Sequence, residues 1–315
     1  MKLLITCGGT GGHIYPAIAI AQKTINKFED IIFVGSQKRM EKDLVARENF
    51  KFFAISVSRK NPLVILYGFF QALILLIRYK PDRVLATGGY VTVPVIIAAA
   101  LLRKKIFIQE QNRLPGKVNR FLSRFADTVF SGYPDNQKYF SKKAKFVFTG
   151  NPLREHLQNL SMPSQKSFHL LVMGGSLGAK AIDEWVLRNQ GRFDFEYTHI
   201  HAGNYIHDMR PVYQKTSLIL CRAGAMTLTE IAALGIPAIL IPYPIAADDH
   251  QNINAEYFKL AGGAFVYAQN QLADSKVIEK ILELKNNPEN LKQMSLNMKK
   301  VGRADSAEII AKSIL

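Results

Sequence analysis

The sequence has little of what would indicate a secreted or membrane-spanning protein. Its 315 residues contain two cysteines, Cys7 and Cys221, and each ends an apolar run, so we expect buried thiols in a reducing compartment rather than a disulfide. Only Leu3–Cys7 separates Met1-Lys2 from the first glycines, which is too short for the core of a signal peptide. These features predict a cytoplasmic setting.

Familiar signatures of nucleotide and metal sites are also missing. The loop Gly8–His13, GGTGGH, has neither the GxGxxG register of dinucleotide-binding folds nor the Lys-Ser/Thr of a P-loop. A glycine loop after a first strand can still bind phosphate, but tight strand-to-helix turns need glycine in any case. No DxD-like pair of acids in a strand context is evident, so a divalent metal is permitted but not implied.

Acidic residues are outnumbered, at 25 against 41 Lys and Arg, which gives a net charge of +16 and a pI near 9.7. Such an excess indicates an anionic partner, and nucleic acid, a phosphate-bearing substrate and acidic lipid all qualify. The length predicts two domains, and the 48% hydrophobic content is enough for two ordinary cores.

Short apolar runs alternate with glycine- or proline-marked turns and helical segments, which indicates parallel βα units. The loop Gly174–Ala179 repeats the theme of Gly8–His13, which suggests two similar α/β domains with facing sheet edges. Gly150–Arg154 is the predicted connection, and the polar segment 161–167 resembles a linker. The predicted domains are residues 1–151, with a helix at about 300–315 that packs back on them, and residues 152–299. Strands are expected at residues 2–7, 31–35, 52–57, 83–86, 106–109, 128–131, 145–149, 168–173, 197–201, 218–220 and 238–241.

One stretch, residues 217–257, carries most of the expected chemistry. A strand, a helix capped by Thr227 or Thr229, and a second strand form a βαβ unit whose helix N-terminus attracts anions. The polar run Asp248–Asn254 follows on the same edge, and its side chains, Asp248 and Asp249 among them, suit sugar hydroxyls.

Two segments leave alternatives open. After the strand at 197–201 the chain passes Asn204 with no room for a further helix and strand, so either the domain is abridged or a mobile segment is omitted, and we favour the second.

The nearly apolar run Leu63–Ile77 falls short of the roughly 20 residues of a membrane span. It is a buried helix, or part of it dips into a bilayer interface, where the flanking cations would meet acidic headgroups, and both can be partly true. These cations are Arg59, Lys60, Arg78, Lys80 and Arg83.

Taken together, seven motifs in order resemble the MurG family of UDP-N-acetylglucosamine transferases, which complete lipid II in peptidoglycan synthesis. They are Gly8–His13, Thr87–Tyr90, Glu110–Asn112 with Pro115, Gly116 and Asn119, Gly150–Arg154, Gly174–Ala179, Arg222–Ala225 with Glu230, and Asp248–Gln251 with Asn254. The resemblance implies a GT-B fold, that is, two Rossmann-like doubly wound α/β domains facing across a cleft, with the donor held mainly by the second.

The implied activity is inverting transfer of N-acetylglucosamine from UDP-N-acetylglucosamine to the 4-hydroxyl of the muramyl sugar of lipid I. The implied setting is peripheral, on an acidic membrane surface at the cytoplasmic face of the plasma (inner) membrane. No cofactor is required and no nucleic acid is expected, while other cell-wall synthesis proteins are admitted as partners.

The resemblance also implies site residues. His13 is expected as the base or as the orienter of the acceptor, the alternative being a cap of the following helix. Glu230 is expected to bind the ribose, the alternative being a solvated helix glutamate. Asn112 and Tyr90 face the acceptor or serve loop hydrogen bonding. Ile206 is expected to contact uracil through its backbone. The short stretch near Asn204 departs from the family pattern beside this residue. The full donor set is Thr10, Gly11, Gly12, Asn112, Arg154, Ser176, Ile206, Arg222, Ala225, Met226, Thr227, Glu230, Gln251 and Asn254, with Gly88, Gly89 and Tyr90 on the acceptor side.

Two rival functions can be weighed from the sequence. A related transferase acting on another lipid acceptor, such as diacylglycerol, would share the fold and the phosphate turn. A nucleic-acid-binding module would need cations clustered with aromatic residues along one face, whereas here they flank an apolar helix and scatter elsewhere.

Overall fold

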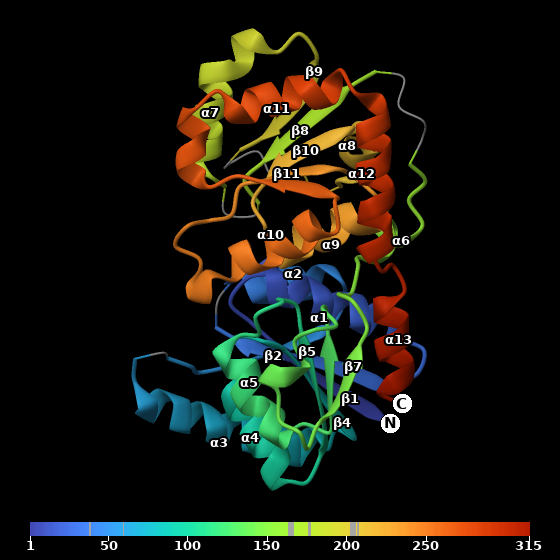
Figure 1. Cartoon of the computed structure of the whole chain (residues 1–315). Coiled ribbons are helices and arrows are strands. Elements are labelled where there is room, and N and C mark those ends of the chain that lie inside the picture. Colours follow the sequence, from blue (N-terminus) through green and yellow to red (C-terminus); the bar gives the residue numbers. More distant parts are fainter. Residues whose placement is uncertain (38, 59, 163–166, 176–177, 202–205, 207) are drawn as a thin grey trace. The chain divides into compact units, whose positions relative to one another are not determined.

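The structure, a computed structural model, describes all residues except 38, 59, 163–166, 176, 177, 202–205 and 207. The chain divides into two compact units (Figure 1). Unit 1 contains Met1–Glu155 and Ala304–Leu315, and unit 2 contains His156–Arg303. Each unit has its own parallel sheet.

The sheet of unit 1 has seven parallel strands in the order β3-β2-β1-β4-β5-β6-β7. The order reverses direction between β1 and β4, and in open α/β sheets ligands bind beyond the carboxyl ends of the strands at such a point. The strands are β1 (Lys2–Cys7), β2 (Asp30–Ser36), β3 (Lys51–Ile55), β4 (Arg83–Gly88), β5 (Lys105–Glu110), β6 (Thr128–Ser131) and β7 (Lys145–Phe148).

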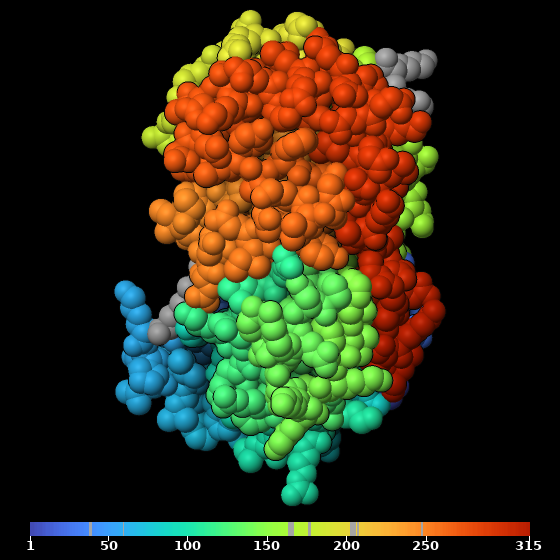
Figure 2. All heavy atoms as spheres, in the orientation of Figure 1, coloured from blue at the N-terminus to red at the C-terminus, as the bar shows by residue number. Residues whose placement is uncertain are grey.

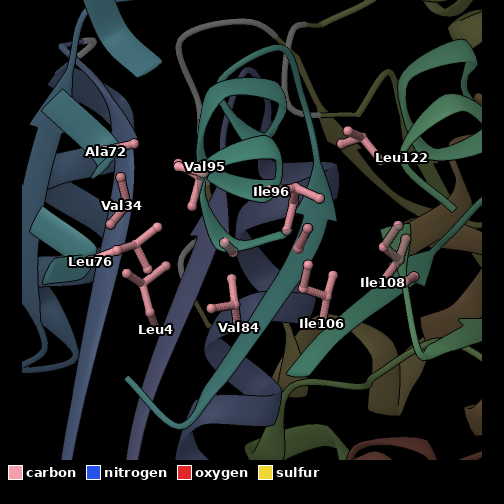
Figure 3. Packing of buried hydrophobic residues seen from close by; sticks show 14 of the residues in the cluster. Leu4, Val34, Ala72, Leu76, Val84, Val95, Ile96, Ile106, Ile108 and Leu122 are labelled. Carbon is pink, nitrogen blue, oxygen red and sulfur yellow. The ribbon is translucent and has the colours of Figure 1, made fainter. Parts of the chain in front are cut away.

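Both faces of this sheet are buried, because successive side chains of β1 enter different cores. Leu4 joins a cluster with Leu76 of α3 and Ile96 of α4 (Figure 3), whereas Leu3 and Ile5 pack under α1. The helices of the first face are α3 (Pro62–Tyr79), α4 (Thr92–Leu101) and α5 (Lys117–Leu122), followed by the short turns η1 (Ser123–Phe125) and η2 (Gln137–Tyr139). The second face carries α1 (Gly11–Thr24), α2 (Arg39–Arg47) and the C-terminal α13 (Ser306–Ser313).

The C-terminal helix belongs to unit 1 although it follows unit 2 in sequence. Ile310 and Ile314 lie fully buried in the core beneath α1. Ser306 Oγ donates to Gly150 O at 2.8 Å, and Arg83 Nε donates to Ile314 O at 3.1 Å. The chain therefore closes on the unit from which it started.

Unit 2 has five parallel strands in the order β12-β11-β10-β8-β9, so its direction reverses between β8 and β10. Trp185 of α7 and Ile281 of α11 are fully buried against one face of this sheet. The strands are β8 (His169–Met173), β9 (Glu196–Ile200), β10 (Leu218–Cys221), β11 (Ala238–Leu240) and β12 (Ala264–Val266). The helices and short turns are α6 (Glu155–Gln158), α7 (Lys180–Asn189), η3 (Gln190–Arg192), α8 (Arg210–Lys215), α9 (Ala225–Leu234), η4 (Ala247–Asp249), α10 (His250–Leu260), η5 (Gln269–Ala273), α11 (Lys276–Lys285) and α12 (Pro288–Val301).

The passage from β9 to β10 differs from the expectation of a direct run. Among the described residues of this passage there is the short helix α8, and no strand. The interpretation of an omitted segment concerned Asn204, which lies outside the described residues, as does most of the predicted linker at 161–167.

Candidate functional site

Two glycine loops meet at the reversal point of the sheet in unit 1. Gly8 N donates to Gly88 O at 3.1 Å, which joins the loop after β1 to the loop after β4. A Cβ on Gly89 would lie 2.3 Å from Gly8 O, and Gly89 has a φ of +94°. This approach is therefore open only to glycine.

His13 stands in the first turn of α1 beside these loops. Its Nδ1 is 2.9 Å from Gln111 Oε1, and its backbone oxygen accepts from Thr87 Oγ1 at 2.7 Å. A Cβ on Gly88 would lie 2.8 Å from the imidazole ring, so the ring packs directly on that glycine. Thr10 occupies the N-cap position of α1, so the alternative of His13 as a helix cap is wrong.

Buried amides support the loop after β5. Gln111 Nε2 donates to Thr87 O at 2.7 Å and to Gln109 Oε1 at 2.6 Å. Gln109 Nε2 donates to Asn151 Oδ1 at 3.0 Å, and Asn151 Nδ2 donates to Gln111 O at 2.9 Å. Gln109 and Gln111 were not predicted as site residues, although Gln111 lies within the motif Glu110–Asn112 and both belong to the polar run at the end of β5.

The next residue, Glu110, is a buried carboxylate that shapes the same loop. It accepts from Asn112 N at 2.8 Å, from Asn112 Nδ2 at 3.2 Å and from Gly116 N at 3.1 Å. Asn119 Nδ2 donates to it at 2.9 Å. Loop hydrogen bonding is thus confirmed for Asn112, and its contact with a substrate stays a prediction.

Glu41 supports the first glycine loop through hydrogen bonds. The sequence analysis did not predict it as a site residue. Its Oε1 accepts from Gly9 N at 2.7 Å and from Ser36 Oγ at 2.9 Å, and the side chain is 1% exposed. A Cβ on Gly8 or on Gly35 would strike this carboxylate. The Glu41 carboxylate therefore holds the first glycine loop in place by accepting from the backbone amide of Gly9.

The other residues predicted for this edge lie close to the same loops. Gly11 and Gly12 open α1, where the first amides have no partner inside the helix. Tyr90 is 43% exposed after the second loop. Arg154 lies in unit 1, with its guanidinium carbon 5.2 Å from the centroid of the Tyr15 ring.

In unit 2 the loops after β8 and β10 flank the reversal point. A Cβ on Gly174 would lie 2.4 Å from Ala179 N, and Gly175 and Gly178 have φ values of +85° and +72°. The predicted contact Ser176 lies outside the described residues. The turn after β8 thus needs glycine at several places before α7 can begin.

Helix α9 begins without a side-chain cap. Gly224 is its N-cap residue, and Thr229 Oγ1 donates to Ala225 O at 2.8 Å inside the helix, so the predicted cap by Thr227 or Thr229 is wrong. The amides of the first turn, which include Met226 and Thr227, have no intrahelical acceptor. Such a terminus suits an anion.

Glu230, one turn further along α9, is 7% exposed and accepts from Tyr213 Oη at 2.7 Å through Oε2. The alternative of a solvated glutamate is therefore wrong. Tyr213 is 1% exposed and was not predicted. The phenol of Tyr213 therefore helps to orient the Glu230 carboxylate.

Arg222 fixes the segment after β11. Its guanidinium donates to Ile241 O at 3.1 Å, to Pro242 O at 3.2 Å and to Gln269 Oε1 at 2.6 Å. Burial lowers the pKa of this guanidinium, and the nearby Tyr243 opposes that shift. Nε is the atom of Arg222 that has no hydrogen-bond partner among the described residues.

One side chain of the polar run after β11 forms a hydrogen bond with the backbone of the same segment. Gln251 Oε1 accepts from Tyr243 N at 2.9 Å, and Asn254 is fully buried in α10. Asp248 and Asp249 are exposed and adopt left-handed φ values of 51° and 56°. Ile206 is half-buried, and its contact with uracil stays a prediction. Within the described part of the chain, no group of three or more His, Cys, Asp or Glu is arranged to hold a metal ion.

A separate surface of unit 1 is formed by α3. Gly68, Ala72 and Leu76 are the buried residues of this helix, so it is buried along one face only and the buried-helix alternative holds in part. By length and composition α3 could cross a membrane, although those three residues pack on the unit. Figure 2 shows residues 60–80, in blue, at the surface. The outward apolar side chains, 50–72% exposed, are Leu63, Leu66, Tyr67, Phe70, Ile74 and Ile77.

Cations accompany this surface. Lys60, Arg78 and Lys80 are exposed at the ends of α3, while Arg59 lies outside the described residues and Arg83 binds the C-terminal carbonyls. On the same sheet face, α5 and η2 enclose a hollow lined by several cations and aromatic rings. Its lining includes Lys117, Arg120, Phe121, Arg124 and Tyr139.

Comparison with known proteins also finds two successive domains in the chain. Residues 3–131 match the glycosyltransferase family 28 N-terminal domain, and residues 187–310 match the glycosyltransferase family 28 C-terminal domain. A crystal structure of MurG from Acinetobacter baumannii is 26% identical with a TM-score of 0.84, and the match covers 99% of each chain.

Curated relatives match the full length. A protein of Lawsonia intracellularis (strain PHE/MN1-00) is 36% identical, covering 100% of this chain and 97% of its own. One of Thermoanaerobacter sp. (strain X514) is 38% identical, covering 100% and 99%. Both are named UDP-N-acetylglucosamine–N-acetylmuramyl-(pentapeptide) pyrophosphoryl-undecaprenol N-acetylglucosamine transferase. These alignments are longer than the chain, so the relatives carry residues that have no counterpart here. With two parallel-sheet Rossmann-like units of the GT-B type, the chain belongs to glycosyltransferase family 28 and, within it, to the MurG family.

Proposed function

We propose that this protein transfers N-acetylglucosamine from UDP-N-acetylglucosamine to the 4-hydroxyl of the muramyl sugar of lipid I, which gives lipid II. The observation that carries this proposal is the full-length match to relatives named for that reaction, at 36–38% identity. The anion-binding geometry at the reversal points of both sheets supports it, because both substrates contain a pyrophosphate.

The donor is assigned mainly to unit 2. The first-turn amides of α9 receive the diphosphate, and Glu230, which Tyr213 orients, accepts from the ribose. Gln251, Asn254 and the acids Asp248 and Asp249 follow β11, where sugar hydroxyls need directional partners.

The acceptor and the proton transfer are assigned to unit 1. His13 takes the proton of the acceptor hydroxyl while that oxygen forms a bond to the anomeric carbon. The bond from the anomeric carbon to the phosphate oxygen breaks at the same time, and its electron pair leaves with UDP. The configuration of the sugar is thereby inverted. Amides and Arg154 balance the charge on the leaving diphosphate, and no cofactor is required.

The protein acts at the cytoplasmic face of the membrane as a peripheral enzyme. The outward apolar side chains of α3 supply area that water solvates poorly, and the cations around them attract acidic headgroups. An undecaprenyl-linked acceptor remains in the bilayer, so an enzyme that docks on the surface reaches it without extracting the lipid.

The test is transfer of radiolabelled N-acetylglucosamine by the purified full chain. Lipid I and diacylglycerol are offered in parallel in acidic vesicles. Label should enter lipid I only. Transfer to diacylglycerol alone would mean that the protein is a lipid transferase of another specificity, and transfer to neither would refute the proposal.

A further inference from the structure

The amide of Gln111 has one orientation that its surroundings allow. Its Nε2 lies 2.7 Å from Thr87 O and 3.3 Å from Gln109 O, and both are backbone carbonyl oxygens that only accept hydrogen bonds. If the amide were reversed, its oxygen would face those carbonyls. The nitrogen end is therefore directed at them, and Oε1 is directed at His13.

This orientation decides where a neutral His13 carries its proton. Oε1 of Gln111 lies 2.9 Å from His13 Nδ1 and can only accept, so Nδ1 must be the N–H donor. A neutral imidazole has one N–H, which leaves Nε2 with an unshared electron pair. We propose that Gln111 is a positioning residue that keeps the proton of His13 on Nδ1 and so makes Nε2 the atom that receives the acceptor's proton.

The positioning residue is itself firmly held. Gln111 is 1% exposed, and its backbone oxygen accepts from Asn151 Nδ2 at 2.9 Å. A Cβ on Gly132 would overlap the Asn151 amide, so that amide is enclosed as well. The groups that orient Gln111 are amides and backbone carbonyls, which do not change charge with pH. The tautomer is thus set by neutral dipoles rather than by a carboxylate beside the ring.

The inference rests on the proposed function only where it concerns catalysis. When the acceptor hydroxyl loses its proton to Nε2, the ring becomes an imidazolium and keeps its Nδ1–H bond to the Gln111 oxygen. The ring stays oriented during the transfer because this bond exists in both protonation states. Without Gln111 the ring could place its single proton on Nε2, and that tautomer cannot act as a base from the same position.

The first experiment observes the tautomer directly by ¹⁵N NMR of full-length protein labelled at histidine. The sequence has seven histidines, so the His13 signals are identified by their loss in His13→Gln. In the neutral ring, Nδ1 should show a bonded proton and Nε2 the shift of an unprotonated nitrogen. A proton on Nε2 would overturn the inference, whatever the enzyme's activity.

The second experiment is Gln111→Met, which keeps the length of the side chain but removes its hydrogen bonds. We expect kcat to fall roughly 10- to 10²-fold while the affinity for UDP, measured by calorimetry, is unchanged. Thr24→Val is the matched control, because it removes a fully buried hydrogen bond at the far end of α1; its kcat should stay normal. An unchanged kcat in folded Gln111→Met would contradict the positioning role.

The two experiments also separate this inference from the proposed function. If the wild-type protein does not use lipid I, the function is wrong, while the NMR result still decides the tautomer. If Gln111→Met does not fold, the wild-type spectrum alone confirms or refutes the assignment.

Discussion

At the scale of single residues, the site depends on buried groups that orient the groups a substrate would touch. Gln111 does this for His13, Glu41 for the first glycine loop and Tyr213 for Glu230. A buried hydrogen bond to a charged group contributes about 1.5–3 kcal/mol, so removing one supporting atom should produce a measurable change in binding.

Tyr213→Phe tests the support of Glu230, since it removes the hydroxyl that donates to the carboxylate at 2.7 Å and keeps the buried ring. The carboxylate then loses a hydrogen bond that orients it, and we expect UDP to bind about tenfold more weakly, which corresponds to about 1.4 kcal/mol. Calorimetry with UDP measures this. Tyr267→Phe, on the segment after β12 in the same unit, is the control and should bind normally; equal affinities in all three proteins would mean that Tyr213 has only a packing role.

The two thiols make a second prediction at this scale. Burial raises the pKa of Cys221 to about 12 and raises that of Cys7 further still, with the Glu41 carboxylate adding to the effect on Cys7. The thiolate is the reactive form, so neither thiol should react with a disulfide reagent at pH 8 in the native state. Both should react after denaturation. A native thiol that titrates within minutes would show that burial does not protect it.

At the scale of elements, α3 combines an inner face that packs on unit 1 with an outer apolar face. An exposed apolar patch with cations at its ends is typical of a surface that binds a membrane. This element decides the proposed peripheral location.

The double substitution Phe70→Glu with Ile74→Glu should release the protein from vesicles that contain phosphatidylglycerol, because it places charge where apolar contact is needed. Sedimentation with the vesicles measures the bound fraction. The matched control is Leu187→Glu with Leu260→Glu, which makes the same chemical change at 66% and 72% exposed residues of unit 2. If both variants sediment like the wild type, α3 is not the membrane contact.

Helix α13 is the second element whose role can be tested. Ile310 is fully buried beneath α1, and Ile310→Ala should lower the free energy of unfolding of unit 1 by about 2–5 kcal/mol. Ile309→Ala, on a half-buried position of the same helix, should lower it less. Denaturant unfolding followed by circular dichroism compares the two. Equal losses would indicate that α13 contributes helix content but no specific packing.

At the scale of the whole molecule, the charge of +16 and the amide-rich edges of both sheets favour the binding of anionic substrates without a bound metal ion. Transfer to lipid I should therefore continue at an unchanged rate when a chelator removes divalent cations. The assay is run with and without EDTA, and with magnesium restored to the EDTA sample. A rate that falls with EDTA and returns with magnesium would show that a metal takes part.

Much of the fold could be predicted from local pattern. Buried strands in parallel sheets are short apolar runs, and the turns that follow them need glycine wherever the backbone takes a positive φ, as at Gly89 and Gly175. For this reason the described strands other than β12 (Ala264–Val266), the two Rossmann-like units and the glycine loops could be predicted, whereas β12, which is only three residues long, was missed. The cap of α9 was not, because Gly224 takes a position that a nearby threonine could equally have filled.

The residues that support the site come together only when the chain folds. Gln111 lies 98 residues from His13, Tyr213 lies 17 residues from Glu230, and Glu41 lies 32 residues from Gly9. Such pairs cannot be predicted from a spacing along the chain. The exposure of the outer face of α3 could not be predicted either, because an apolar run has the same sequence pattern whether it faces a core or a membrane. Most strands, the glycine turns and the family follow from local chemistry along the chain, so they could be predicted without the fold. The partners of each polar group depend on which loops the sheet order brings together, and that order exists only in the folded chain.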